Sequence, residues 1–107
     1  MKLRHLASAL CLAASAGIAC AEDPNLARNL AATCANCHGT DGQAVPGAGM
    51  AALAGTDRNK LAQTIRDFRS GTRPGTVMPQ IAKGYTDEQI DLIATYYAAH
   101  KAGSARP

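Results

Sequence analysis

The sequence Cys34-Ala35-Asn36-Cys37-His38 says more about this protein than any other stretch of the chain. Two thiols at this spacing can each form a thioether bond to one vinyl group of a haem. The histidine that follows directly is then held under the iron as an axial ligand. The motif therefore predicts one covalently bound haem c, with Cys34 and Cys37 as the attachment points and His38 as an iron ligand.

Other uses of a C-x-x-C pair fit the sequence less well. A zinc site needs two further ligands, and after the motif the chain has no other cysteine and only one more histidine, His100. A thioredoxin-type dithiol follows a β-strand in a βαβ unit, and no strand-like run precedes Cys34. A structural disulfide across two intervening residues would connect very little of the chain. We therefore interpret the motif as a haem attachment site.

The first 21 residues have the pattern of a secretory signal peptide. A basic start precedes an apolar stretch over residues 6–16, and small residues provide a cleavage site after Ala21. The apolar stretch is shorter than the ~20 residues that span a bilayer. A lipid anchor on Cys20 is an alternative, but Gly17 stands where such signals usually have leucine. We predict a signal peptide over residues 1–21, one domain over residues 22–107 and a periplasmic location.

The predicted mature chain is close to neutral. The full sequence has 11 Lys and Arg against 8 Asp and Glu, and cleavage after Ala21 removes Lys2 and Arg4. The remaining formal charge of +1 becomes about −1 once two ionised haem propionates are added. A nucleic-acid-binding domain usually shows a basic excess with interleaved aromatic residues. This composition excludes that class, and we predict neither nucleic-acid binding nor a membrane span.

Sequence patterns predict an all-α fold with three main helices. The first helix begins at Asp23, followed by Pro24 at the first helical position, and carries Cys34 on the face that meets the core. The second helix runs from a cap at Thr56 or Asp57 to about residue 70. The two loops, over residues 39–55 and 71–84, are rich in glycine and proline.

The last helix has the clearest start. Thr86 and Gln89 have the spacing of a capping box. The apolar residues that follow at helical spacing are Ile90, Ile93, Ala94 and Tyr97. No segment alternates convincingly with a period of two. We therefore expect a single domain in which helices and Gly/Pro loops surround one haem.

The second axial ligand has four kinds of candidate: Met50, Met78, His100 and lysine side chains. Met50 lies only twelve residues past His38, so the chain would have to pass quickly round the ring edge. His100 stands near the end of the last helix, as a surface histidine would. Met78 follows a full helix and precedes Pro79, which favours an extended, stiff backbone. We predict Met78 as the second ligand, which leaves no open iron position and favours one-electron transfer.

These motifs together resemble a known family. Cys34-x-x-Cys37-His38-Gly39, the loop with Leu53-Ala54-Gly55, Met78-Pro79 and the C-terminal amphipathic helix look like a small class I cytochrome c of the c4/c-553 kind. A narrower likeness is carried by residues 37–42, residues 67–74, Met78 and residues 81–90. These stretches are similar to the haem subunit of flavocytochrome c sulfide dehydrogenase.

The resemblance implies a small cytochrome c fold and an electron-transfer protein that is not itself an enzyme. In class I proteins a proline carbonyl of the first loop accepts a hydrogen bond from the proximal histidine, which implies this role for Pro46. Four positions before Cys34, where an aromatic residue often stands, this chain has Leu30. We therefore expect an aliphatic-to-tyrosine contact between the terminal helices. The narrower likeness implies a sulfide-oxidising flavoprotein partner whose flavin passes electrons to the haem one at a time.

Two other functions stay open, namely a free soluble electron shuttle of the c4/c-553 kind and a haem enzyme or sensor with an open iron position. The position of the charged residues along the chain indicates what kind of partner the protein would bind. Residues 58–83 contain six basic residues and one acidic residue, so a positive region beside Met78 would suit an acidic partner. An ordinary solvated helix face explains the same charges equally well. Val77, Pro79 and Ile81 flank Met78 and form the expected apolar contact patch, and inward packing of these side chains over the haem ring is the alternative.

Overall fold

The computed structural model describes residues 21–103, so residues 1–20 of the predicted signal peptide lie outside the described part. All regular structure in this range is helical. The elements are α1 (Leu26–His38), the short 3-10 helix η1 (Thr40–Gly42), α2 (Arg58–Ser70), α3 (Met78–Ala82) and α4 (Asp87–Ala98). The predicted all-α class is confirmed. No helix between residues 21 and 103 has the length and apolar composition that a membrane span requires.

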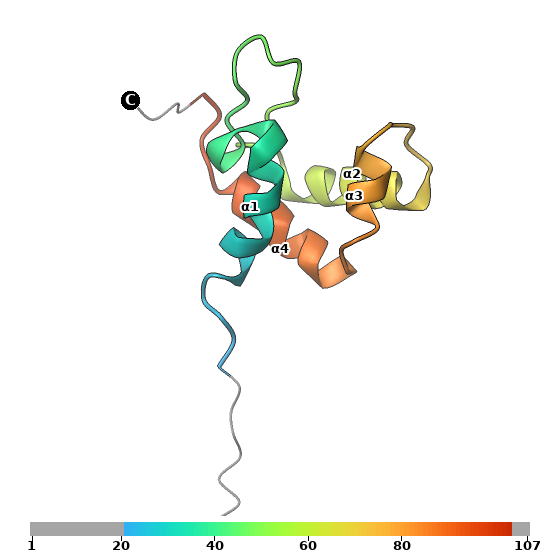
Figure 1. Cartoon of the computed structure of the whole chain (residues 1–107). Coiled ribbons are helices and arrows are strands. Elements are labelled where there is room, and N and C mark those ends of the chain that lie inside the picture. Colours follow the sequence, from blue (N-terminus) through green and yellow to red (C-terminus); the bar gives the residue numbers. More distant parts are fainter. Residues whose placement is uncertain (1–20, 104–107) are drawn as a thin grey trace, which may run out of the picture.

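The four α-helices share one core. α1 packs against α4, α2 packs against α4, and α3 packs against α2 (Figure 1). The buried core residues are Ala31, Leu61, Ala62, Ile65, Ala82, Ile90, Ile93, Ala94 and Tyr97. Leu30 packs against this core, and the Tyr97 hydroxyl donates to the Ala31 carbonyl at 2.6 Å, so the terminal helices meet through aliphatic and tyrosine side chains as expected. Many of the core residues are alanines, so the protein's own interior is small.

Local capping rules set the ends of two helices. The Asp57 carboxylate accepts from the Lys60 backbone N–H at 2.9 Å at the start of α2. Thr86 and Gln89 form both halves of a capping box at the start of α4, at 3.2 and 2.9 Å. α2 ends at Gly71, which has a left-handed backbone with φ 82°. These predicted boundaries are confirmed.

The first helix begins at Leu26, not at Asp23 as the sequence suggested. The Asp23 carboxylate accepts from the backbone N–H of Asn25 at 2.8 Å and from the side-chain amide of Asn29 at 3.1 Å. Asp23 therefore stabilises a turn ahead of the helix rather than capping the helix itself.

A fourth α-helix, α3, lies where the sequence analysis expected an irregular loop. Met78 is its first residue and Pro79 its second. The first turn of a helix has no intrahelical partner for its N–H groups, so a proline there loses nothing and its fixed φ already suits the helix. The three predicted main helices are present as α1, α2 and α4, whereas the expectation of an extended backbone at Met78 is wrong.

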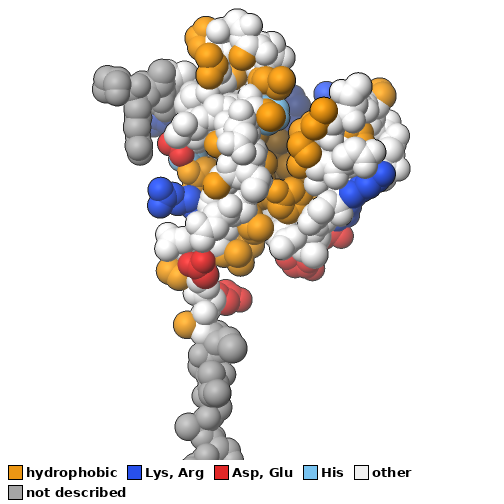
Figure 2. Space-filling model, in the orientation of Figure 1, with side chains coloured by type: hydrophobic (Ala, Val, Ile, Leu, Met, Phe, Trp, Pro, Cys, Tyr) orange, Lys and Arg blue, Asp and Glu red, His pale blue; other side chains and the backbone are white. Residues whose placement is uncertain are grey.

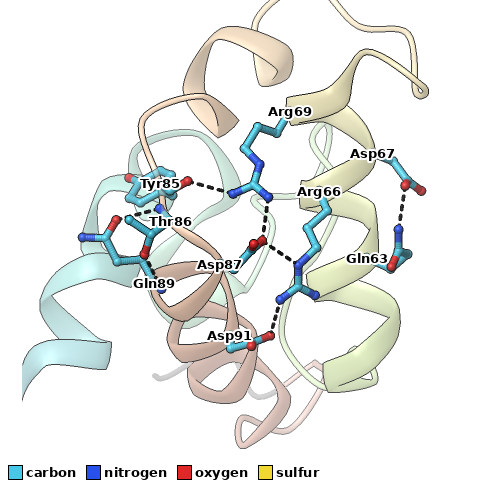
Figure 3. Close-up of polar contacts among 9 residues, drawn as sticks. All are labelled: Gln63, Arg66, Asp67, Arg69, Tyr85, Thr86, Asp87, Gln89 and Asp91. Atoms are coloured by element: carbon cyan, nitrogen blue, oxygen red, sulfur yellow. Dashed lines mark hydrogen bonds and ion pairs between the residues drawn. The ribbon is translucent and has the colours of Figure 1, made fainter.

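The basic run of residues 58–83 is partly neutralised inside the molecule. Arg66 donates to Asp87 at 3.0 Å and to Asp91 at 2.8 Å, and Arg69 donates to Asp87 and to the Tyr85 carbonyl (Figure 3). These contacts join α2 to the start of α4. The neighbouring guanidinium groups of Arg69 and Arg66 lower the pKa of Asp87. The run thus presents less free positive charge to a partner than its sequence suggests.

Candidate functional site

Cys34, Cys37 and His38 occupy the C-terminal end of α1. Residues three and four apart lie on the same side of a helix, so the two thiols and the imidazole share one side of α1. Cys34 is half-buried against the core, Cys37 is exposed, and both are free thiols. The fold thus presents the three groups of the motif together.

The His38 ring is fixed by one hydrogen bond to the loop that follows. Its Nδ1 lies 2.7 Å from the backbone carbonyl oxygen of Ala51. A carbonyl can only accept, so the ring proton must be on Nδ1. In the neutral ring, Nε2 then carries a free lone pair, which is the state in which an imidazole binds a metal.

Ala51, not Pro46, supplies the carbonyl that orients His38, so the expectation for Pro46 is wrong in this structure. Pro46 instead occupies an exposed turn closed by a 3.1 Å hydrogen bond from the Ala48 N–H to the Val45 carbonyl. A proline at the first central position of a turn, followed by a glycine with positive φ, is a favourable pair for this geometry. A backbone carbonyl has no residue signature, so residue type could not have identified Ala51.

Two glycines let the loop return to His38. Gly39 has φ 84° and ψ 158°, a region accessible to glycine, and a Cβ there would lie 1.8 Å from the Gln43 carbonyl oxygen. Gly42 has φ 76°, and its carbonyl accepts from the N–H groups of Leu53 at 2.9 Å and Ala54 at 3.1 Å. These bonds close the loop and bring Ala51 back beside the end of α1.

The surroundings of the thiols argue against zinc and thiol redox chemistry. Cys34 lies in the C-terminal half of α1, where the negative end of the helix dipole disfavours a thiolate. Burial raises the pKa of the Cys34 thiol further. Between residues 21 and 103, no three His, Cys, Asp or Glu side chains are arranged to hold a metal ion. Two free thiols beside an oriented imidazole suit haem attachment instead.

The methionine candidate lies on a different element. Figure 2 shows a hollow with hydrophobic side chains on its walls, between the part of the molecule formed by α1 with its following loop and the part formed by α2 and α3. Met78, half-buried, begins α3. An apolar hollow between a helix with thiols and a helix with a thioether suits the faces of a porphyrin.

The other ligand candidates are placed less favourably. Met50 is 48% exposed in the loop that follows η1. His100 has its Nδ1 2.7 Å from the Tyr96 carbonyl and its Nε2 3.6 Å from the Asp41 carboxylate. Both ring nitrogens of His100 thus face groups of the protein itself, and the side chain is half-buried, so the expectation of a surface histidine is wrong.

Residues 21–96 match the family model described as cytochrome c oxidase, cbb3-type, subunit III. The chain belongs to this cytochrome c family. Its cofactor is therefore a covalently bound haem c, and the predicted cytochrome c fold and cofactor are confirmed.

Relatives bear out the resemblance found from the motifs. The cytochrome subunit of sulfide dehydrogenase from Chlorobaculum tepidum is 41% identical over 68 residues, which make up 64% of this chain and 60% of the relative. Cytochrome c-554(548) from Halomonas halodenitrificans is 38% identical over 76 residues, covering 64% of this chain and 86% of the relative. The solved structure of thiosulfate dehydrogenase (TsdBA) from Marichromatium purpuratum has a TM-score of 0.64 and 33% identity, covering 78% of this chain and 20% of that chain.

The match therefore spans less than two thirds of the sulfide dehydrogenase subunit and a fifth of the thiosulfate dehydrogenase chain. The part that these two relatives have in common with the chain is a cytochrome c domain, and both relatives are named as dehydrogenases or their subunits. This agrees with the electron-accepting cytochrome role predicted from the sequence.

Proposed function

We propose that this protein is a periplasmic one-electron carrier, exported by a signal peptide over residues 1–21. Its single haem c would be attached through Cys34 and Cys37, with His38 and Met78 as axial ligands. The observation that carries the proposal is the 2.7 Å contact of His38 Nδ1 with the Ala51 carbonyl, because it leaves Nε2 free beside two free thiols. When bound, the haem supplies one-electron oxidation and reduction at its iron.

The chain's own residues keep this site fixed. The Ala51 carbonyl orients the His38 ring and makes it a more basic ligand. A thioether from Met78 would favour the ferrous state of the iron and raise its reduction potential. If His38 and Met78 both held the iron, no position would remain for oxygen, peroxide or a substrate, and the protein alone would not act as a catalyst.

The partner we propose is the flavoprotein of a sulfide-oxidising dehydrogenase. The 41% identity to a cytochrome subunit of sulfide dehydrogenase supports this partner. Val77 and Ile81, on either side of Met78, are 59% and 39% exposed and offer apolar contact area. Since Arg66 and Arg69 are paired within the molecule, such a complex would depend more on apolar burial than on charge.

A free electron shuttle is the second candidate. It is favoured by the likeness to cytochrome c-554(548), because the match covers 86% of that protein.

The ligand assignment is tested by Met78→Ala. This substitution should remove the weak long-wavelength absorption that methionine sulfur bound to ferric iron produces. It should also open a position at which carbon monoxide binds the reduced protein. Met50→Ala is the matched control and should change neither property. If Met50→Ala removes the absorption band and Met78→Ala leaves it, the ligand assignment is wrong.

The partner assignment is tested by gel filtration of a native periplasmic extract at about 0.5 M salt, where the Debye length is only ~4 Å. Apolar burial is not screened by salt, so a subunit complex should survive, and haem and flavin absorbance should elute together. Haem absorbance that elutes alone at the size of the monomer would favour the shuttle.

A further inference from the structure

A hydrogen bond joins the helix of the haem motif to the segment that follows α3. The Thr33 Oγ1, one residue before Cys34, lies 2.6 Å from the hydroxyl of Tyr85, 52 residues further along the chain. The Thr33 hydroxyl also donates to the Leu30 carbonyl at 3.1 Å. Since a threonine hydroxyl has one proton, Tyr85 must donate and Thr33 must accept.

Tyr85 is tied closely to α3 and α2. Its backbone N–H donates to the carbonyl of Ala82, the last residue of α3, at 3.3 Å. Its own carbonyl accepts from Arg69 of α2 at 3.1 Å (Figure 3). The ring packs half-buried against the core. A displacement of Tyr85 is therefore coupled to the position of α3.

The main packing contacts between the helices do not join α1 directly to α3. α3 packs mainly on α2, whereas α1 packs mainly on α4 and η1. The two helices stand on either side of the hollow (Figures 1 and 2). The Thr33–Tyr85 bond thus links the part of the molecule that carries His38 to the part that carries Met78.

We propose that the Thr33–Tyr85 hydrogen bond is a latch that holds the Met78 side of the haem site against the His38 side. Thr33 and Tyr85 are then positioning residues for the sixth iron ligand. The proposal rests on the proposed assignment of Met78. An external ligand that replaces Met78 needs the form in which Met78 has left the iron, and its apparent affinity rises in proportion to the population of that form. The latch keeps this population low and keeps the same ligand on the iron in both oxidation states.

Imidazole binding to the ferric holoprotein measures this population. Tyr85→Phe keeps the ring and removes the donor, and the loss of one net hydrogen bond predicts an increase of about 2- to 10-fold in apparent imidazole affinity. Thr33→Val should give a similar increase. The double variant should show no further increase, because both substitutions break the same bond.

Tyr96→Phe is the matched control. It removes a hydroxyl that donates to Asp41 at 2.7 Å, a contact between α4 and η1 that does not join α1 to the α3 segment. Its imidazole affinity should stay within about 2-fold of the wild type. The latch is refuted if Tyr85→Phe and Thr33→Val leave the affinity unchanged, or if Tyr96→Phe raises it as much.

Failure of the latch is distinguishable from failure of the ligand assignment. If Met78→Ala leaves the sulfur-to-iron absorption band in place, the assignment of Met78 fails and the latch fails with it. If the band depends on Met78 but Tyr85→Phe does not change imidazole affinity, the latch alone is wrong.

Discussion

Replacing Gly42 with alanine should destabilise the protein much more than the same replacement at Gly49. A Cβ at Gly42 would lie 2.7 Å from the Ala54 backbone nitrogen, 2.7 Å from Tyr97 Cδ1 and 3.0 Å from Leu53 Cβ. Tyr97 is fully buried, and the Ala54 N–H is bonded to the Gly42 carbonyl, so neither group can move away without further loss. At Gly49, no atom lies within 4 Å of the position that a Cβ would occupy.

The two glycines share the cost of a left-handed backbone and differ in the packing cost. Their φ angles are 76° and 71°, and a residue with a Cβ costs about 1–2 kcal/mol in this region. Overpacking at Gly42 adds about 1–3 kcal/mol. Gly42→Ala should therefore lower the free energy of unfolding by about 2–5 kcal/mol, and Gly49→Ala by about 1–2 kcal/mol.

Denaturation of the ferric holoproteins by guanidinium chloride, followed by circular dichroism, measures the loss of unfolding free energy in each variant. The comparison holds when the variants and the wild type have the same m value. In thermal unfolding, each kcal/mol corresponds to about 4–8 °C in Tm for a domain of this size. Equal losses in the two variants, or a negligible loss in Gly42→Ala, would show that the loop does not pack against Tyr97 and Ala54 as described.

Three further predictions concern other parts of the molecule. Because two arginines of α2 hold the pKa of Asp87 below its ordinary value of 3.8, its stabilising contribution is present above about pH 4 and is lost as the pH falls below that value. An acid titration of unfolding free energy should therefore be less steep below pH ~4 in Asp87→Asn than in the wild type. Thr86→Ala removes the cap of α4 and should cost about 1 kcal/mol in the same denaturation experiment. Replacing both Cys34 and Cys37 with serine should let acid acetone extract the haem, which the wild-type protein should retain.

Features that depend on neighbours in sequence were predictable. The motif from Cys34 to His38 fits within little more than one turn of a helix, so its spacing alone shows which groups share a face. The caps at Asp57 and Thr86 follow from hydrogen bonds to residues three positions away, and the structure has both. Such short-range rules also predicted the all-α class.

The predictions were wrong where one residue type is compatible with two backbone conformations. They were also wrong where a side chain's hydrogen-bonding or ion-pair partner lies far away in the sequence. Pro79 is equally compatible with an extended segment and with the first turn of a helix, and packing of α3 on α2 decides for the helix. In the basic run, Arg66 finds its partners 21 and 25 residues away and Arg69 finds one 18 residues away. Sequence alone shows the charges, and only the fold shows that they are paired.

The contact that orients His38 shows why residue type is a poor guide to this loop. Ala51 acts through its backbone carbonyl, thirteen residues after His38, and a substitution at position 51 would leave that carbonyl in place. The orientation of His38 depends on the number of residues between the end of α1 and residue 51. It also depends on the hydrogen bonds from the Leu53 and Ala54 N–H groups to the Gly42 carbonyl, which close the loop. A change in length within residues 43–50 would therefore disturb the orientation of the His38 ring more than a change in the side chain of Ala51.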